Sequence, residues 1–98
     1  MQSMVKHMKE KQRKEKIERI FNHKINGESY FQGSSYQWKK IVFQHYNRMK
    51  RQELKIEQLI SILEKEGIQF TQHRSLIQYP IIDFIKYIAK VCKENIEI

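Results

Sequence analysis

The feature that most constrains the fold of this chain is a run of residues spaced alternately four and three positions apart. A repeat of this period places every member along one side of an α-helix. The run therefore predicts a long central helix over about residues 36–66. Gly67 follows it, and glycine is typical of the position after a helix C-terminus. The members are Trp38, Val42, His45, Met49, Gln52, Ile56, Leu59 and Leu63.

Local signals define the start of this helix and leave its continuity open. Ser34 and Gln37 fit a capping box, in which each side chain satisfies a backbone N–H of the first turn, so the helix begins near Tyr36. The run is polar at His45 and Gln52. A second interpretation is therefore two helices with a bend near residues 50–53.

A basic helix is expected before the central one. Residues 3–23 contain strong helix formers around an apolar stripe of Ile17, Ile20 and Phe21. Residues 9–16 carry no apolar side chain, so they form either a solvated helix arm or a segment that stays disordered until a partner binds.

The C-terminal segment is the most apolar helix that the sequence predicts. Pro80 is tolerated in a first helical turn and marks a start there, which gives a helix over about residues 80–94. Thr71 is a candidate N-cap for a short turn in the connector before it. We expect this helix to contribute most of the core and to pack against Ile56–Leu63. Its apolar face holds Ile81, Phe84, Ile85, Ile88 and Cys92.

The chain thus divides into a basic N-terminal helix or arm at residues 1–23 and a helical domain at residues 24–98. The domain contains a loop at 22–35, where Asn26-Gly27 is a strong turn dipeptide. A length of 98 residues allows one small core. The fold class that we expect is all-α, a small helical domain of three to four helices with one long central helix.

Positive charge lies almost entirely in the first half of the sequence. Residues 1–50 hold 12 Lys and Arg against 4 acidic residues, whereas residues 51–98 hold 7 of each. A clustered positive field attracts polyanions. Nucleic acid is therefore the expected partner, with DNA favoured over RNA.

The sequence contains no arrangement typical of catalysis or metal binding. Four widely spaced histidines and a single cysteine do not form a zinc motif, and three glycines do not build a phosphate-binding loop. We expect no enzyme activity, no metal, no cofactor and no small-molecule substrate. The absence of a long apolar run and of a disulfide framework predicts no membrane association and a nuclear or cytoplasmic location.

The strongest candidate for a binding surface is the stretch from Ser29 to Gln52, which contains no acidic residue. On a helix its polar side chains fall opposite the apolar run, and Arg, Asn and Gln are the side chains that read base edges in the major groove. The alternative is an ordinary solvated helix face. The nucleic-acid-binding residues that we predict are Lys39, Lys40, Gln44, Asn47, Arg48, Lys50, Arg51 and Lys55.

Aromatic residues lie just upstream of this helix. Tyr30, Phe31 and Tyr36 are expected to stack on unpaired bases if the ligand is single-stranded.

Residues 40–50, KIVFQHYNRMK, resemble the recognition helix of homeodomains, which usually reads K-I-W-F-Q-N-R-R-M-K. This homeobox-like segment has one residue more between FQ and RMK, Val42 stands where the family has tryptophan, and the adenine-reading asparagine falls on His45 or Tyr46. The resemblance implies a helix with Val42 or Phe43 in the core. It implies that the side chains presented to DNA are Gln44, Asn47, Arg48 and Arg51.

Residues 79–90, YPIIDFIKYIAK, are similar to the second helix of the dimerisation and docking modules related to the regulatory subunit of protein kinase A. An apolar helix on a thin core often completes its burial against another chain. The predicted partner-binding residues are Ile81, Phe84, Ile85 and Ile88.

Three functions are consistent with these features. The first is a DNA-binding accessory subunit of a larger nuclear or DNA-modifying complex. The second is a structural or adaptor subunit that binds partner proteins through its apolar helices. The third is an RNA-binding subunit of a particle.

Overall fold

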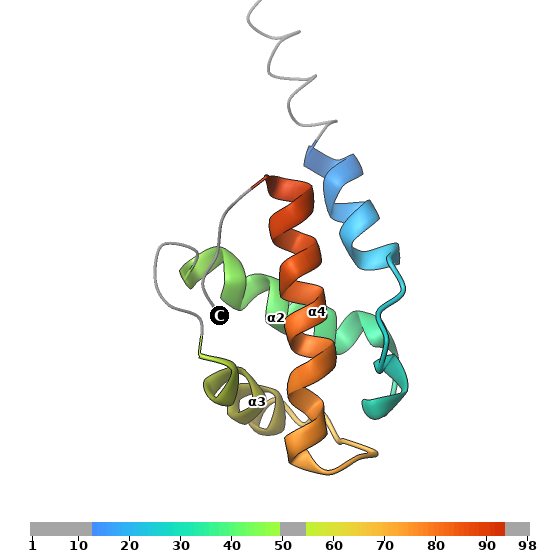
Figure 1. Ribbon diagram of the computed structural model, residues 1–98, viewed down its shortest axis with the longest axis vertical. Helices are drawn as coiled ribbons and strands as arrows, with labels where there is room; N and C mark the ends of the chain where they lie inside the picture. Colours follow the sequence, from blue (N-terminus) through green and yellow to red (C-terminus); the bar gives the residue numbers. More distant parts are fainter. Residues whose placement is uncertain (1–12, 50–54, 94–98) are drawn as a thin grey trace, which may run out of the picture.

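The protein is an all-α domain, as its sequence predicts. The computed structural model describes residues 13–49 and 55–93, and all the regular elements in these ranges are helices. Figure 1 shows α4 crossing α2, with α3 beside one end of α4 and the N-terminal helix beside the other. The elements are a helix over residues 13–22, the short 3₁₀ helix η1 (Glu28–Tyr30), α2 (Ser35–Met49), α3 (Ile56–Lys65) and α4 (Arg74–Cys92).

Of the two interpretations of residues 36–66, one continuous helix is wrong, and two helices, α2 and α3, occupy this range. Lys55 has an extended backbone, with φ −99° and ψ 109°, so the helix is broken before Ile56. In a single helix Trp38 and Leu63 would lie roughly 38 Å apart along the axis. Separate helices let both side chains pack against α4, and both are fully buried.

The end of α3 follows the sequence signal closely. The N–H of Ile68 donates to the carbonyl of Leu63 at 3.0 Å, and the N–H of Gly67 donates to that of Glu64 at 3.1 Å. These two bonds form a Schellman motif, which requires a left-handed residue at Gly67, where φ is 86°. The predicted position of Gly67 after the helix is confirmed.

The predicted start of the last helix at Pro80 is wrong, because α4 begins at Arg74. The Nδ1 atom of His73 accepts a hydrogen bond from the N–H of Ser75 at 3.1 Å and caps the first turn. Arg74 forms ion pairs with Glu57 and Glu64 of α3. Pro80 lies inside the helix, where it cannot donate a backbone hydrogen bond, and it is buried in the core together with Ile77 of the preceding turn. The helix ends at Cys92, before the predicted residue 94.

The core is built around α4, as predicted, and faces α2 and α3. Leu59 and Leu63 of α3 are fully buried against it. Trp38 lies at the centre of an aromatic cluster, with its ring stacked on Phe31 at 4.3 Å and edge-on to Phe84 at 5.4 Å. Such aromatic contacts contribute beyond the area that they bury.

The predicted loop at residues 22–35 contains η1 and is tied to the connector between α3 and α4. The N–H of Gln32 donates to the carbonyl of Gln69, and the N–H of Thr71 donates to that of Tyr30, both at 2.8 Å. Thr71 does not cap a helix as predicted. Its hydroxyl donates instead to the carbonyl of Ser29 at 2.7 Å.

A buried lysine joins the N-terminal helix to the rest of the fold. The Nζ atom of Lys39 on α2 donates to the carbonyls of Phe21 at 3.3 Å and His23 at 2.7 Å, and it pairs with Glu28 at 2.5 Å. Ile20 is buried in the common core. The helix over residues 13–22 therefore packs into the same core as the segment after residue 23.

Replacing Lys39 is expected to destabilise the fold strongly. Lys39→Ala removes the cation that pairs with Glu28 and the donor to two backbone carbonyls, which should lower the free energy of unfolding by about 3 kcal/mol. Lys40→Ala is the matched control, because this neighbouring lysine is exposed; its effect should stay within about 0.5 kcal/mol. Urea unfolding followed by circular dichroism measures both. Equal effects of the two substitutions would contradict this role of Lys39.

Gly27 and Gly67 form a second matched pair. Both have positive φ, 95° and 86°, but a Cβ at Gly27 would lie 3.2 Å from Cβ of Pro80, whereas a Cβ at Gly67 would have no neighbour within 4 Å. Gly67→Ala should lower stability by about 1 kcal/mol through backbone strain alone. Gly27→Ala should cost at least about 1 kcal/mol more because Pro80 must move. Thermal unfolding of both variants measures the two losses of stability. A larger loss for Gly67→Ala than for Gly27→Ala would contradict this prediction.

Candidate nucleic-acid interface

One side of α2 is polar, exposed and free of acidic residues. We define this outer face of α2 by six exposed side chains that share neighbouring positions around the helix. It carries two cations, three amides and one aromatic ring, and donors and acceptors of this kind contact phosphates and base edges. The six residues are Tyr36, Gln37, Lys40, Gln44, Asn47 and Arg48.

The outer face exists because α2 is strongly two-sided. Trp38, Val42 and Tyr46 recur one turn apart and are buried against the rest of the protein. Burial of this apolar side fixes the rotation of the helix, and so it places the polar side in solvent. Val42 is a core residue, and Phe43 is half-buried at the edge of the core.

The structure brings together four of the predicted nucleic-acid-binding residues. Lys40, Gln44, Asn47 and Arg48 all lie on the outer face of α2. Lys55 is exposed but belongs to the start of α3. The predicted residues Lys50 and Arg51 lie outside the described ranges.

Lys39 was also predicted to bind nucleic acid, and this prediction is wrong. It is 1% exposed, and its ammonium group is engaged by Glu28 and two carbonyls. Lys39 and Lys40 are adjacent in sequence, but neighbouring residues point about 100° apart around a helix. One therefore faces the protein and the other faces solvent.

The predicted partner-binding residues are also misplaced. All four have 0% exposure and form the centre of the core. The apolar face of α4 is covered by α2, α3 and the N-terminal helix, so a partner protein has no access to it. These residues are Ile81, Phe84, Ile85 and Ile88.

Of the three aromatic residues predicted to stack on bases, Tyr36 is the most accessible. It is 56% exposed, and the Nζ atom of Lys40 lies 6.0 Å from its ring centroid. Phe31 is buried and stacked on Trp38, which excludes it from such a role. Tyr30 is half-buried.

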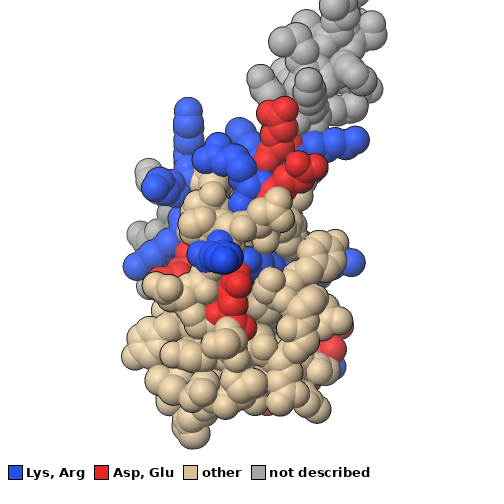
Figure 2. Space-filling model, turned by 90° about the vertical axis from the view of Figure 1, so that its right-hand side faces the viewer, with Lys and Arg blue, Asp and Glu red and all other residues tan. Residues whose placement is uncertain are grey.

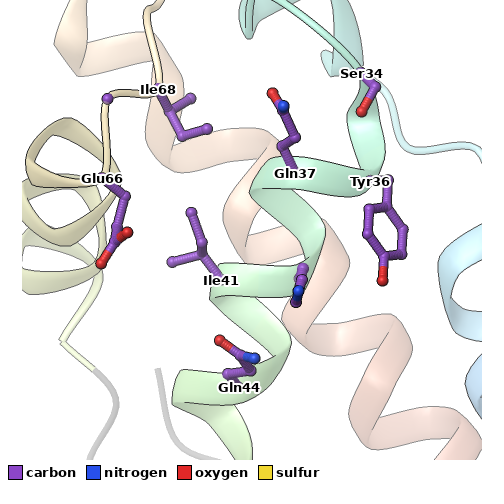
Figure 3. Close-up of a pocket in the computed structure, with 9 residues that line it drawn as sticks. Ser34, Tyr36, Gln37, Ile41, Gln44, Glu66 and Ile68 are labelled. Carbon is purple, nitrogen blue, oxygen red and sulfur yellow. The ribbon is translucent and has the colours of Figure 1, made fainter.

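A groove runs along one edge of the outer face. It has a volume of about 650 Å³ and lies between α2 and the turn that ends α3. Figure 3 shows Gln37 and Ile41 on the side of α2 toward Ile68, with Tyr36 on the other side of the helix. Glu66 contributes a carboxylate to the lining of this groove, which also includes Tyr36, Gln37, Lys40 and Gln44 of the outer face.

His45 lies at the boundary between the core and the outer face. Its side chain is half-buried, and its Nε2 atom has no hydrogen-bond partner among the described residues. Burial, with a smaller contribution from the nearby Arg48 cation, lowers the pKa of His45 below its usual 6.5. A neutral ring carries one N–H donor fewer than a charged one, so it needs one acceptor partner fewer.

A second basic region includes the N-terminal helix. Figure 2 shows the side of the molecule on which this helix lies. Lys and Arg gather over the upper part of the molecule in this view, whereas the lower part is largely uncharged. Arg13, Lys14, Lys16 and Arg19 are exposed there but alternate with glutamates.

Lys24, Lys86 and Lys90 form a part of this basic region, around one small pocket, that the sequence pattern did not predict. Lys86 and Lys90 are four residues apart, so they share a face of α4. This spacing was the available signal. The approach of Lys24 depends on tertiary packing.

Neither a metal site nor a membrane-spanning segment is found in the described part of the chain. No group of three His, Cys, Asp or Glu side chains there is placed to hold a metal ion. None of the described helices is both long and apolar enough to cross a bilayer.

Comparisons with known proteins give no match. No family model matches the chain, and no curated protein or solved structure is detectably similar to it.

The stability of the protein should depend on pH through His45. Because the unfolded chain takes up this proton at a higher pH than the folded protein does, the stabilising contribution is complete above pH 6.5 and is lost as the pH falls through the lowered pKa. His45→Gln should reduce the pH dependence of urea unfolding. Arg48→Gln should raise the His45 pKa measured by NMR titration, and titration of His45 at or above 6.5 in the parent protein would disprove the assignment.

Proposed function

We propose that this protein binds duplex DNA through the outer face of α2 and acts as an accessory subunit of a larger nuclear or DNA-modifying complex. The observation that carries the proposal is an exposed helix face with two cations, three amides and no carboxylate. Arg pairs with guanine, and Asn or Gln pairs with adenine, in the major groove.

The dimensions of α2 suit this role. Gln37 and Arg48 lie about 16 Å apart along the helix axis at a rise of about 1.5 Å per residue. The major groove of B-DNA is about 12 Å wide and admits one α-helix. The resemblance to the homeodomain recognition helix supports the same docking mode, with Gln44 and Asn47 turned toward the bases.

Duplex DNA is favoured over duplex RNA for a geometric reason. The major groove of A-form RNA is deep and too narrow for side chains on a helix to read. A helix face rich in amides would therefore contact only the phosphates of an RNA duplex. Lys40 and Arg48 provide the phosphate contacts in the DNA complex, and Lys50 and Arg51 follow in the sequence.

An accessory role fits the lack of catalytic groups on this surface. The outer face of α2 holds no nucleophile with an adjacent base and no pair of carboxylates. Binding without chemistry places such a protein beside an enzyme that acts on the same DNA.

A protein-binding adaptor is the second candidate function. Leu76 and Tyr79 are exposed large apolar side chains three residues apart on α4. Exposed apolar groups of this kind favour contact with a partner protein. An adaptor would therefore contact its partner through Leu76 and Tyr79, and not through the buried face of α4.

The binding proposal predicts a charge-specific loss of affinity. A double substitution, Lys40→Ala with Arg48→Ala, should weaken binding to duplex DNA about tenfold or more. It should also reduce the slope of log K against log salt by about 1.8, because two phosphate contacts are lost. Fluorescence anisotropy with a labelled duplex at about 50 mM and about 200 mM salt measures both quantities.

The matched control removes two other exposed lysines, Lys65 and Lys93, by substitution with alanine. It keeps the same net charge as the test variant but leaves the outer face of α2 intact, so its affinity should fall much less. Equal losses in the two variants would show diffuse attraction rather than a binding face. Unchanged affinity in the test variant would reject the DNA interface and leave the adaptor function.

A further inference from the structure

A pocket of about 300 Å³ lies between the loop after the N-terminal helix and the second half of α4. Its side chains come from segments roughly 60 residues apart in the sequence, and none of them belongs to α2. It is therefore separate from the outer face of α2. Its principal side chains are His23, Lys24, Asp83, Lys86, Tyr87 and Lys90.

Two rings form a stack in the wall of this pocket. The imidazole of His23 lies parallel to the ring of Tyr87, with centroids 3.7 Å apart and an interplanar angle of 7°. His23 is exposed, whereas Tyr87 is half-buried. One face of the His23 ring is covered by Tyr87, and the opposite face is available to continue the stack.

A hydrogen bond to its backbone carbonyl holds His23 in position. Its carbonyl accepts a hydrogen bond of 2.7 Å from the buried Lys39 ammonium. The ring is therefore presented by an anchored residue. Binding loses less conformational entropy when the contacting group is already held in place.

The charges around the stack favour an anion. Lys24, Lys86 and Lys90 are all exposed, and no ion pair engages them among the described residues. Asp83 is the one acidic side chain in the lining, so the three lysines exceed it by two positive charges. Free lysine ammonium groups are suited to phosphate oxygens.

We propose that this pocket binds a nucleotide whose base is unpaired. The base extends the stack of Tyr87 and His23, and the phosphate group lies among Lys24, Lys86 and Lys90. An aromatic platform beside a positive groove is the arrangement by which proteins hold single-stranded nucleic acid. A base inside a duplex is covered on both faces, so duplex DNA offers this platform nothing to stack on.

The test uses the full chain and two probes, a labelled oligothymidylate and adenosine diphosphate. His23→Ala removes the platform but keeps the backbone carbonyl that Lys39 contacts. It should weaken binding of the oligonucleotide about 5-fold to 100-fold. A second variant, Lys86→Ala with Lys90→Ala, should weaken it as well and reduce its salt dependence by about 1.4 in slope.

The control variant carries Lys65→Ala and Lys93→Ala and should retain the affinity of the parent protein for oligothymidylate. Circular dichroism confirms that each variant is folded. Binding of both probes identifies a site for nucleotides in general, and binding of the oligonucleotide alone identifies a site for a strand. Unchanged affinity in the His23 and Lys86/Lys90 variants would overturn the proposal.

Loss of single-strand binding in the Lys40/Arg48 variant instead would assign the strand to α2 and also overturn the proposal. The duplex-binding proposal is judged separately, because it depends on the affinity of the Lys40/Arg48 variant for duplex DNA. Either proposal can fail while the other stands.

Discussion

The buried ammonium group of Lys39 is the interaction on which the arrangement of this small domain depends. Three segments meet at this one atom: the end of the N-terminal helix through the carbonyls of Phe21 and His23, η1 through Glu28, and α2 through Lys39 itself. The carbonyls at a helix C-terminus lack partners within the helix and carry partial negative charge. A cation from a neighbouring helix satisfies them and compensates for its own loss of hydration.

This contact also organises the surface. Glu28 pairs with Lys39, and Glu57 and Glu64 pair with Arg74. The described residues of α2 contribute no carboxylate to its outer face, and Glu66 borders the groove beside that face. His23 is anchored by the same ammonium, which places the second basic pocket beside α4. Both proposed binding surfaces thus depend on how Lys39 is buried.

Several predictions from the sequence failed for a common reason. Periodicity predicted helices at both ends of the Trp38–Leu63 run but could not choose between one helix and two, because each half of the run keeps the same spacing whether or not the halves are collinear. Pro80 is a valid local start signal. It was overridden by the cap at His73 and by the ion pairs of Arg74, both of which precede it in the chain.

The sequence by itself determined the all-α class, the turn at Gly27, the end of α3 at Gly67 and the polar side of α2, because these follow from side-chain period and local backbone preference. Only the tertiary structure decided which cations are free. Lys39 and Lys40 are adjacent residues of the same type. Lys39 is buried and contacts backbone carbonyls, whereas Lys40 faces solvent. Burial of the apolar face of α4 and the convergence of Lys24 with Lys86 and Lys90 were decided in the same way. Local sequence specifies how a helix is patterned, whereas the groups that surround it come from distant parts of the chain.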